Sequence, residues 1–119
     1  MEVDPSQMPE PEDVDGYVRR GYVFYSRHMY KEAETDFRNA VSLNPEAVDA
    51  IYALGMTLKA QREDDAAIKA FQRAIELLEA GVVEGKSRTE MLRRLALGHI
   101  NEITQGNWNL EKEIWQKAE

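Results

Sequence analysis

The chain has 119 residues, 43% of them hydrophobic, and this size and composition suit one small globular domain with a modest core. Its net charge of −7 argues against nucleic-acid binding, because phosphate contacts need clustered Lys and Arg side chains. The sequence has no cysteine, which excludes disulfides and thiolate metal sites and weakly favours a reducing compartment.

Neither a membrane span nor a secretory leader is expected. No apolar run approaches the roughly 18 residues that a membrane-spanning helix needs. The first residues are acidic, whereas a leader begins with a basic stretch that precedes an apolar one. We therefore expect a cytoplasmic protein.

Residues 1–12 are acidic and proline-rich. They hold three of the four prolines and almost no large apolar side chains. Such a composition predicts a disordered tail that keeps the chain soluble. A short recognition motif for a partner is the alternative.

An internal repeat organises residues 14–81. When residues 14–47 are aligned without a gap on residues 48–81, an offset of 34, seven positions are identical. A fixed period of this size is typical of stacked-repeat proteins. The identical residues are Val14, Asp15, Gly21, Ala33, Phe37, Ala40 and Leu43, which match Val48, Asp49, Gly55, Ala67, Phe71, Ala74 and Leu77.

Each unit is predicted to be a pair of helices. In the first unit, apolar side chains recur at i, i+3, i+4 and i+7 between residues 16 and 27 and again between residues 31 and 43. Gly21 lets two backbones approach closely, and Phe37 fills the volume beside it. One pair cannot bury this much apolar surface alone, so neighbouring pairs must stack.

Polar residues and glycines suggest where these helices begin and end. Asp13 or Asp15 can cap the first helix. Asn44 can cap the third, with Pro45 in its first turn, where no amide hydrogen bond is lost. Gly81 supplies the left-handed residue that ends the fourth helix.

After Gly81 the period breaks. Residues 81–86 are predicted to form a loop, and a capping box from Ser87 to Glu90 opens a fifth helix that ends near Gln105. We interpret residues 87–119 as a degenerate third repeat whose second helix, the sixth of the chain, spans residues 111–118. The expected organisation is a tail of residues 1–12 and one domain of residues 13–119, with repeats at 14–47 and 48–81.

Seven positions of each repeat carry a recognisable pattern. The first repeat supplies Tyr17, Gly21, Phe24, Ala33, Phe37, Ala40 and Pro45. The second supplies Ile51, Leu54, Gly55, Leu58, Ala67, Phe71 and Ala74. This pattern resembles that of the tetratricopeptide repeats. It departs from that family at Arg20, where leucine is usual, and at Glu79, where proline is usual.

The resemblance implies a fold and a function. The fold is an all-α, right-handed superhelix of antiparallel helix pairs with about three repeats. The function is a non-catalytic adaptor or scaffold, in which the first helix of each pair lines a concave groove that binds a peptide or amphipathic helix of another protein. The groove positions correspond here to Val18, Arg19, Tyr22, Tyr25, Asp49, Tyr52, Met56, Lys59, Leu95 and His99.

Tyrosine and methionine at these positions suit an apolar or amphipathic partner, because both present adaptable apolar surface. Two alternatives stay open. The aromatic side chains can pack within the chain's own core, or the last helix, with Trp108 and Trp115, can fill the groove instead. A third possibility is structural self-assembly through the groove or through the edge of the third repeat.

One family function is not expected. Members that bind the free C-terminal carboxylate of chaperones have Lys, Arg and Asn at five groove positions. The corresponding residues here cannot hold a carboxylate: Val18, Tyr22, Ala53, Leu92 and Ala96. A chaperone C-terminal carboxylate is therefore not an expected partner.

No enzyme, cofactor or metal site is expected. The only histidines are His28 and His99, neither of which belongs to a motif such as HExxH, and no glycine-rich phosphate loop is present. His99 with Glu102 or Glu90 offers only two candidate metal ligands, which are too few for a site.

Overall fold

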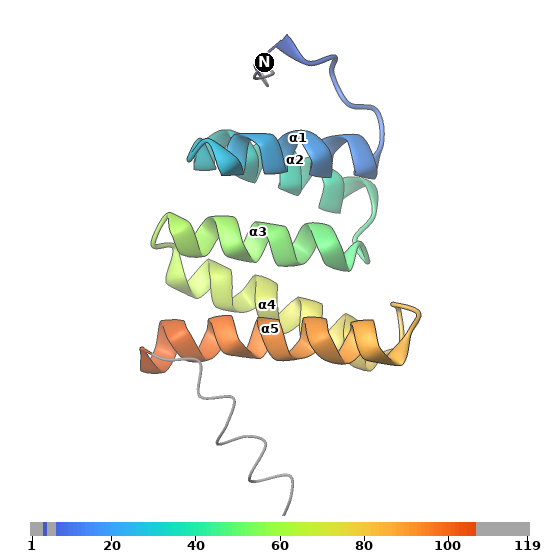
Figure 1. Cartoon of the computed structure of the whole chain (residues 1–119), viewed down its shortest axis with the longest axis vertical. Coiled ribbons are helices and arrows are strands. Elements are labelled where there is room, and N and C mark those ends of the chain that lie inside the picture. Colours follow the sequence, from blue (N-terminus) through green and yellow to red (C-terminus); the bar gives the residue numbers. More distant parts are fainter. Residues whose placement is uncertain (1–3, 5–6, 107–119) are drawn as a thin grey trace, which may run out of the picture.

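The computed structural model describes Asp4 and residues 7–106, and this part of the chain is a stack of five helices (Figure 1). Helices α1, α3 and α5 run side by side, with α2 and α4 behind them. The all-α prediction is confirmed, and the predicted sixth helix lies outside the described residues. The helices are α1 (Val14–Ser26), α2 (Tyr30–Leu43), α3 (Val48–Ala60), α4 (Asp64–Glu79) and α5 (Lys86–Gln105).

The two repeats share one packing device in the core. Phe37 and Phe71 are completely buried, and each ring lies against the glycine of the preceding helix. A Cβ atom added to Gly21 would lie 2.6 Å from Cε1 of Phe37, and one added to Gly55 would lie 2.8 Å from Cε1 of Phe71. Real Cβ atoms do not approach carbon so closely, so the predicted close approach at both glycines is confirmed.

The predicted cap of the first helix is correct, but that of the third is wrong. Oδ1 of Asp13 accepts a 2.8 Å hydrogen bond from the backbone N–H of Gly16, which caps α1. Oδ1 of Asn44 instead accepts from the N–H of Glu46 at 3.0 Å, and α3 begins only at Val48. An asparagine side chain readily bonds the amide two residues further on, and here that local turn replaces the cap.

The predicted capping box of the fifth helix is also wrong. Helix α5 begins one residue before Ser87, and Gly85, at φ 92°, is its N-cap. The hydroxyl of Thr89 donates to the carbonyl of Val83 at 3.2 Å and so ties the first turn to the preceding loop. Gly81, at φ 81°, lies just after α4 as predicted.

The turns between paired helices use a left-handed residue that is not glycine. His28 has φ 61° and Arg62 has φ 63°, and the two are 34 residues apart, at equivalent positions of the two repeats. Such a conformation is costly for a residue with a Cβ atom. Its occurrence at both positions indicates that the packing of each helix pair imposes it.

A buried ion pair lies at the N-terminal end of the stack. Arg20 donates to both carboxylate oxygens of Asp36, from Nε at 2.8 Å and from Nη2 at 2.7 Å, although Asp36 is only 1% exposed. Nη1 of Arg20 also donates to Glu10 at 3.1 Å, so the segment before α1 contacts the same guanidinium. Within the stretch predicted as a tail, the structure describes Asp4 and residues 7–12, and its disorder stays a prediction.

Candidate partner-binding groove

The predicted groove residues come from the three helices that share one face of the stack. Helix α3 lies between the other two and contacts both α1 and α5. We use "the groove" for this face. Its predicted residues lie on α1 (Val18, Arg19, Tyr22, Tyr25), on α3 (Asp49, Tyr52, Met56, Lys59) and on α5 (Leu95, His99).

Most of the apolar groove residues are half-buried. Tyr22 is the most open of the tyrosines, at 41% exposure. Val18, Tyr25, Tyr52 and Met56 are partly buried and pack against the core. Within the described part of the chain, intramolecular packing therefore covers one side of each side chain and leaves the other side open. The alternative in which Trp108 and Trp115 fill the groove lies outside the described residues.

A cavity of about 260 Å³ brings four of the predicted residues together. It is lined by Tyr25 of α1, Met56, Lys59 and Ala60 of α3, His99 of α5, and Arg62. Arg62 is not among the predicted groove residues, because it lies in the turn after α3 and not at a helical groove position. Its left-handed backbone conformation could not be deduced from the helical pattern.

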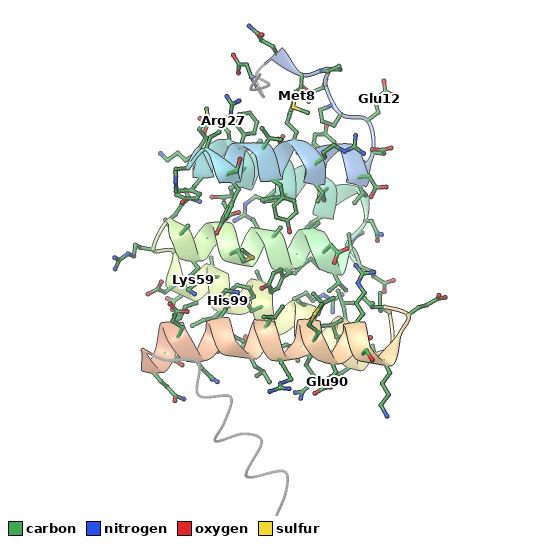
Figure 2. All side chains as sticks on the ribbon, in the orientation of Figure 1. Met8, Glu12, Arg27, Lys59, Glu90 and His99 are labelled. Carbon is green, nitrogen blue, oxygen red and sulfur yellow. The ribbon has the colours of Figure 1, made fainter. Side chains whose placement is uncertain are left out.

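Lys59 links α3 to α5 through two polar contacts. Its ammonium lies 3.0 Å from Nδ1 of His99 and donates to Oε2 of Glu102 at 2.8 Å. Figure 2 shows Lys59 and His99 facing each other between the two helices. An ammonium can only donate, so Nδ1 of His99 must be the acceptor, and the neutral ring carries its proton on Nε2.

That tautomer determines whether the hydroxyl of Tyr52 donates or accepts the hydrogen bond with His99. Nε2 of His99 lies 2.9 Å from the hydroxyl oxygen of Tyr52 and, carrying the proton, donates to it. The hydroxyl proton of Tyr52 then has no acceptor within residues 7–106. Tyr52 can therefore offer a hydrogen bond to a group that enters the groove.

The ring of His99 stacks on the core. It is parallel to the ring of Phe71, with centroids 4.9 Å apart and planes 10° apart. The pKa of His99 is lowered to about 4, chiefly by burial and also by the positive charge of Lys59, while the charge of Glu102 opposes this shift. His99 is thus neutral near pH 7 and serves as a fixed aromatic and polar link between α5 and the second repeat.

Three phenol groups lie within electrostatic reach of one another. Burial raises the pKa of Tyr22, Tyr25 and Tyr52, and that of Tyr52 is raised further by the other two. The rings of Tyr22 and Tyr52 are held edge-on against Phe37 and Phe71, with centroids 5.2 and 5.7 Å apart. The three phenol groups are therefore uncharged near pH 7, and two of their rings are anchored on the core.

Three further predicted groove residues, Asp49, Leu95 and Arg19, do not line the cavity of about 260 Å³. Asp49 forms an exposed ion pair with Arg88 at 2.8 Å. Leu95 lines a separate cavity of about 590 Å³ with other α5 residues, among them Met91. Arg19 is exposed on α1.

The positions that would form a carboxylate clamp are largely buried. Ala53, Leu92 and Ala96 all lie in the hydrophobic core. Of the five clamp positions, only those of Val18 and Tyr22 are open enough to meet a ligand.

These stacked helix pairs define an α-helical repeat protein. A family model described as tetratricopeptide repeat matches residues 14–46 and 48–77, which is more than half of the chain. The chain therefore belongs to the tetratricopeptide repeat family, whose members generally mediate protein–protein interactions and are typically non-catalytic. The curated proteins include no significant match. Among the described helices, none is long and apolar enough to cross a membrane.

Proposed function

We propose that this protein is a non-catalytic, cytoplasmic adaptor that binds a peptide or amphipathic helix of another protein in the groove. The observation that carries the proposal is the cavity between Tyr25, Met56 and His99, which combines an apolar floor with hydrogen-bonding groups. A binding site of this kind takes an apolar anchor and orients it with a few polar contacts. Membership of a family that generally binds proteins supports the same conclusion.

The residues define the chemistry of the partner segment. An apolar side chain suits the surface of Tyr25 and Met56, because both add contact area at little cost in conformational entropy. An oxygen acceptor on the partner, either a backbone carbonyl or a carboxylate, suits the hydroxyl of Tyr52. Arg62 at the edge of the cavity favours acidic over basic residues nearby.

The third helix of the groove is held in place by the contacts of His99. Because its ring stacks on Phe71 and bonds both Lys59 and Tyr52, α5 needs little reordering when a partner binds. Preorganisation of this kind leaves more of the contact energy for affinity.

The test is selection of random dodecapeptides displayed on phage, followed by measurement of Kd by fluorescence anisotropy for the selected peptides. We expect Tyr22→Ala to weaken binding about tenfold, the effect of losing a typical aromatic contact. Tyr52→Phe keeps the ring and removes one hydroxyl, so we expect about a fivefold loss. Gln72→Ala, at an exposed position on α4, is the control and should leave Kd within about twofold. Peptides that bind both tyrosine variants as well as the wild type would contradict the proposal.

Self-assembly is the second candidate function. It is favoured by the exposed face of α5, where Met91 is 54% exposed and borders the cavity of about 590 Å³. Light scattering over a concentration series separates the two functions. A monomer at every concentration excludes self-assembly, whereas a dimer that is lost in Met91→Asp would make it the first function to explain.

A further inference from the structure

A crevice of about 420 Å³ opens between α2 and α4, and it shares no lining residue with the groove cavity. We propose that this crevice binds a medium-chain carboxylate, with the alkyl chain on its apolar floor and the carboxylate at its basic rim. The site is separate from the groove and goes beyond the adaptor function. Its volume lies at the lower end of the range of about 300 to 1,000 Å³ found for small-ligand sites, which favours a medium over a long chain.

The floor of the crevice is apolar. Ile51, Leu54 and Leu58 of α3 are buried beneath it. On α4, Ala66 and Ala70 border the crevice, and their small side chains leave the volume open.

The rim of the crevice is basic, although the chain carries a net charge of −7. All its charged lining residues are cations, namely Arg38, Lys69 and Arg73. Lys69 makes no ion pair with any residue that the structure describes.

Among the described residues, each arginine pairs with a glutamate of its own helix. Arg38 bonds Glu34 at 2.7 Å, and Arg73 lies 3.3 Å from Glu76. The exposed Arg73–Glu76 pair contributes little, about 0 to 1 kcal/mol, so Arg73 can turn to a bound anion. Arg38 uses only its Nε for Glu34, so its other guanidinium nitrogens can contact the anion. The rim is therefore complementary to a negative head group.

The composition of the crevice favours an alkyl chain over a peptide. A bound peptide backbone brings N–H groups that need acceptors once they are removed from water. The lining side chains offer only donors and hydrocarbon, and Pro45 at the edge has no N–H of its own. An alkyl chain buries surface without any unsatisfied polar group and leaves one carboxylate for the cations.

The test is a titration of the ¹⁵N-labelled full chain with sodium decanoate below its micelle concentration, followed by amide shifts. We expect saturable shifts at Leu54, Ala66 and Ala70. Butyrate keeps the head group without the chain, and decyltrimethylammonium keeps the chain with a positive head, so each should bind at least tenfold more weakly. Saturable decanoate shifts confined to the groove or to the Met91 face of α5 would overturn the proposal.

Two variants test the rim and the floor separately. Lys69→Glu should weaken decanoate binding about tenfold, while its matched control Lys31→Glu, exposed on α2 outside the crevice, should leave binding within twofold. Ala70→Leu should abolish binding by filling the crevice, and circular dichroism checks that it folds. Unchanged binding by Lys69→Glu would overturn the proposal. So would occupation of the crevice by a synthetic peptide of leucines and glutamates but not by decanoate, since a protein segment would then be the ligand.

Discussion

Arg20 and Asp36 of the first repeat correspond to Leu54 and Ala70 of the second, at the offset of 34 residues. In the second repeat these two positions face the preceding helix pair. Leu54 lies beneath the crevice that Arg38 of α2 borders. In the first repeat the same face is at the end of the stack, where Glu10 of the N-terminal segment contacts Arg20. The difference shows that the repeat at this end of the described stack carries a buried ion pair where the second repeat carries apolar residues.

The largest effect is expected from Asp36→Ala. This change leaves the guanidinium of Arg20 largely buried without its bidentate partner, and breaking such a pair costs about 3 kcal/mol of unfolding free energy. Urea unfolding followed by circular dichroism measures the loss. Asp65→Ala, at an exposed position on α4, is the control and should change stability by less than about 0.5 kcal/mol.

The double variant Arg20→Leu/Asp36→Ala sharpens the comparison, because it gives the first repeat the residues of the second. We expect it to recover most of the stability lost in Asp36→Ala, since removing both charges leaves neither one buried alone. It should also make the protein associate at high concentration in light scattering, because the end of the stack becomes apolar. A double variant no more stable than Asp36→Ala would argue against this account of the pair.

The next largest effect is a loss of stability on replacing the core glycines, and we expect it to be equal in the two repeats. Gly21→Ala and Gly55→Ala should each lower the unfolding free energy by about 1 to 2 kcal/mol, because a Cβ atom must displace a buried ring, partly offset by the better helix propensity of alanine. Thermal unfolding of both variants tests this. A gain in stability at either site would show that the ring can move aside without cost.

His99 adds a pH dependence that lies at the junction of the second repeat with α5. Its pKa is about 4 in the folded protein and about 6.5 when unfolded, so the unfolded chain binds a proton first as the pH falls. Stability should therefore decrease between pH 6.5 and 4. The loss is about 1 kcal/mol once solvent screening of this half-buried ring is taken into account.

His99→Asn is the control for this pH dependence. Urea unfolding at several pH values measures the difference between the two proteins, which cancels the contributions of the carboxylates. The difference should vary across this pH window. Parallel curves for the variant and the wild type would contradict the prediction.

The smallest expected effect concerns the equivalent turns. Glycine adopts a positive φ at no steric cost, so Arg62→Gly should raise the unfolding free energy by about 0.5 kcal/mol. His28→Gly should raise the unfolding free energy by a smaller amount, because it removes the 2.6 Å contact between Nδ1 of His28 and the hydroxyl of Tyr30. Comparison of the two melting temperatures tests this order, and a larger gain at His28 would reverse it.

The repeat, its helices and its glycine–phenylalanine contacts could be predicted because they depend on residues at a fixed spacing. Gly21 and Phe37 recur at Gly55 and Phe71, and the same packing follows at both positions. The caps at Asn44 and Ser87 were predicted wrongly, since a polar residue near a helix start has several local amides to choose from.

The interior of the groove was harder to predict. The helix pattern assigned Lys59 and His99 to one face, but their contact joins residues 40 positions apart, across the break in the period. The stack of His99 on Phe71 and the resulting tautomer depend on the placement of α5, which the sequence left uncertain. Arg20 was noted as a departure from the family pattern, yet its partner Asp36 could be identified only from the packed structure.

The Arg20–Asp36 pair also makes the two ends of the stack unequal as places to add further helix pairs. A helix pair grafted in front of Val14 would have to displace Glu10 from Arg20 and pack its apolar face against an ion pair instead of against leucine and alanine. Designed arrays that begin with this chain should therefore be lengthened beyond α5 or between existing pairs. Lengthening them at the front would first require leucine and alanine at positions 20 and 36.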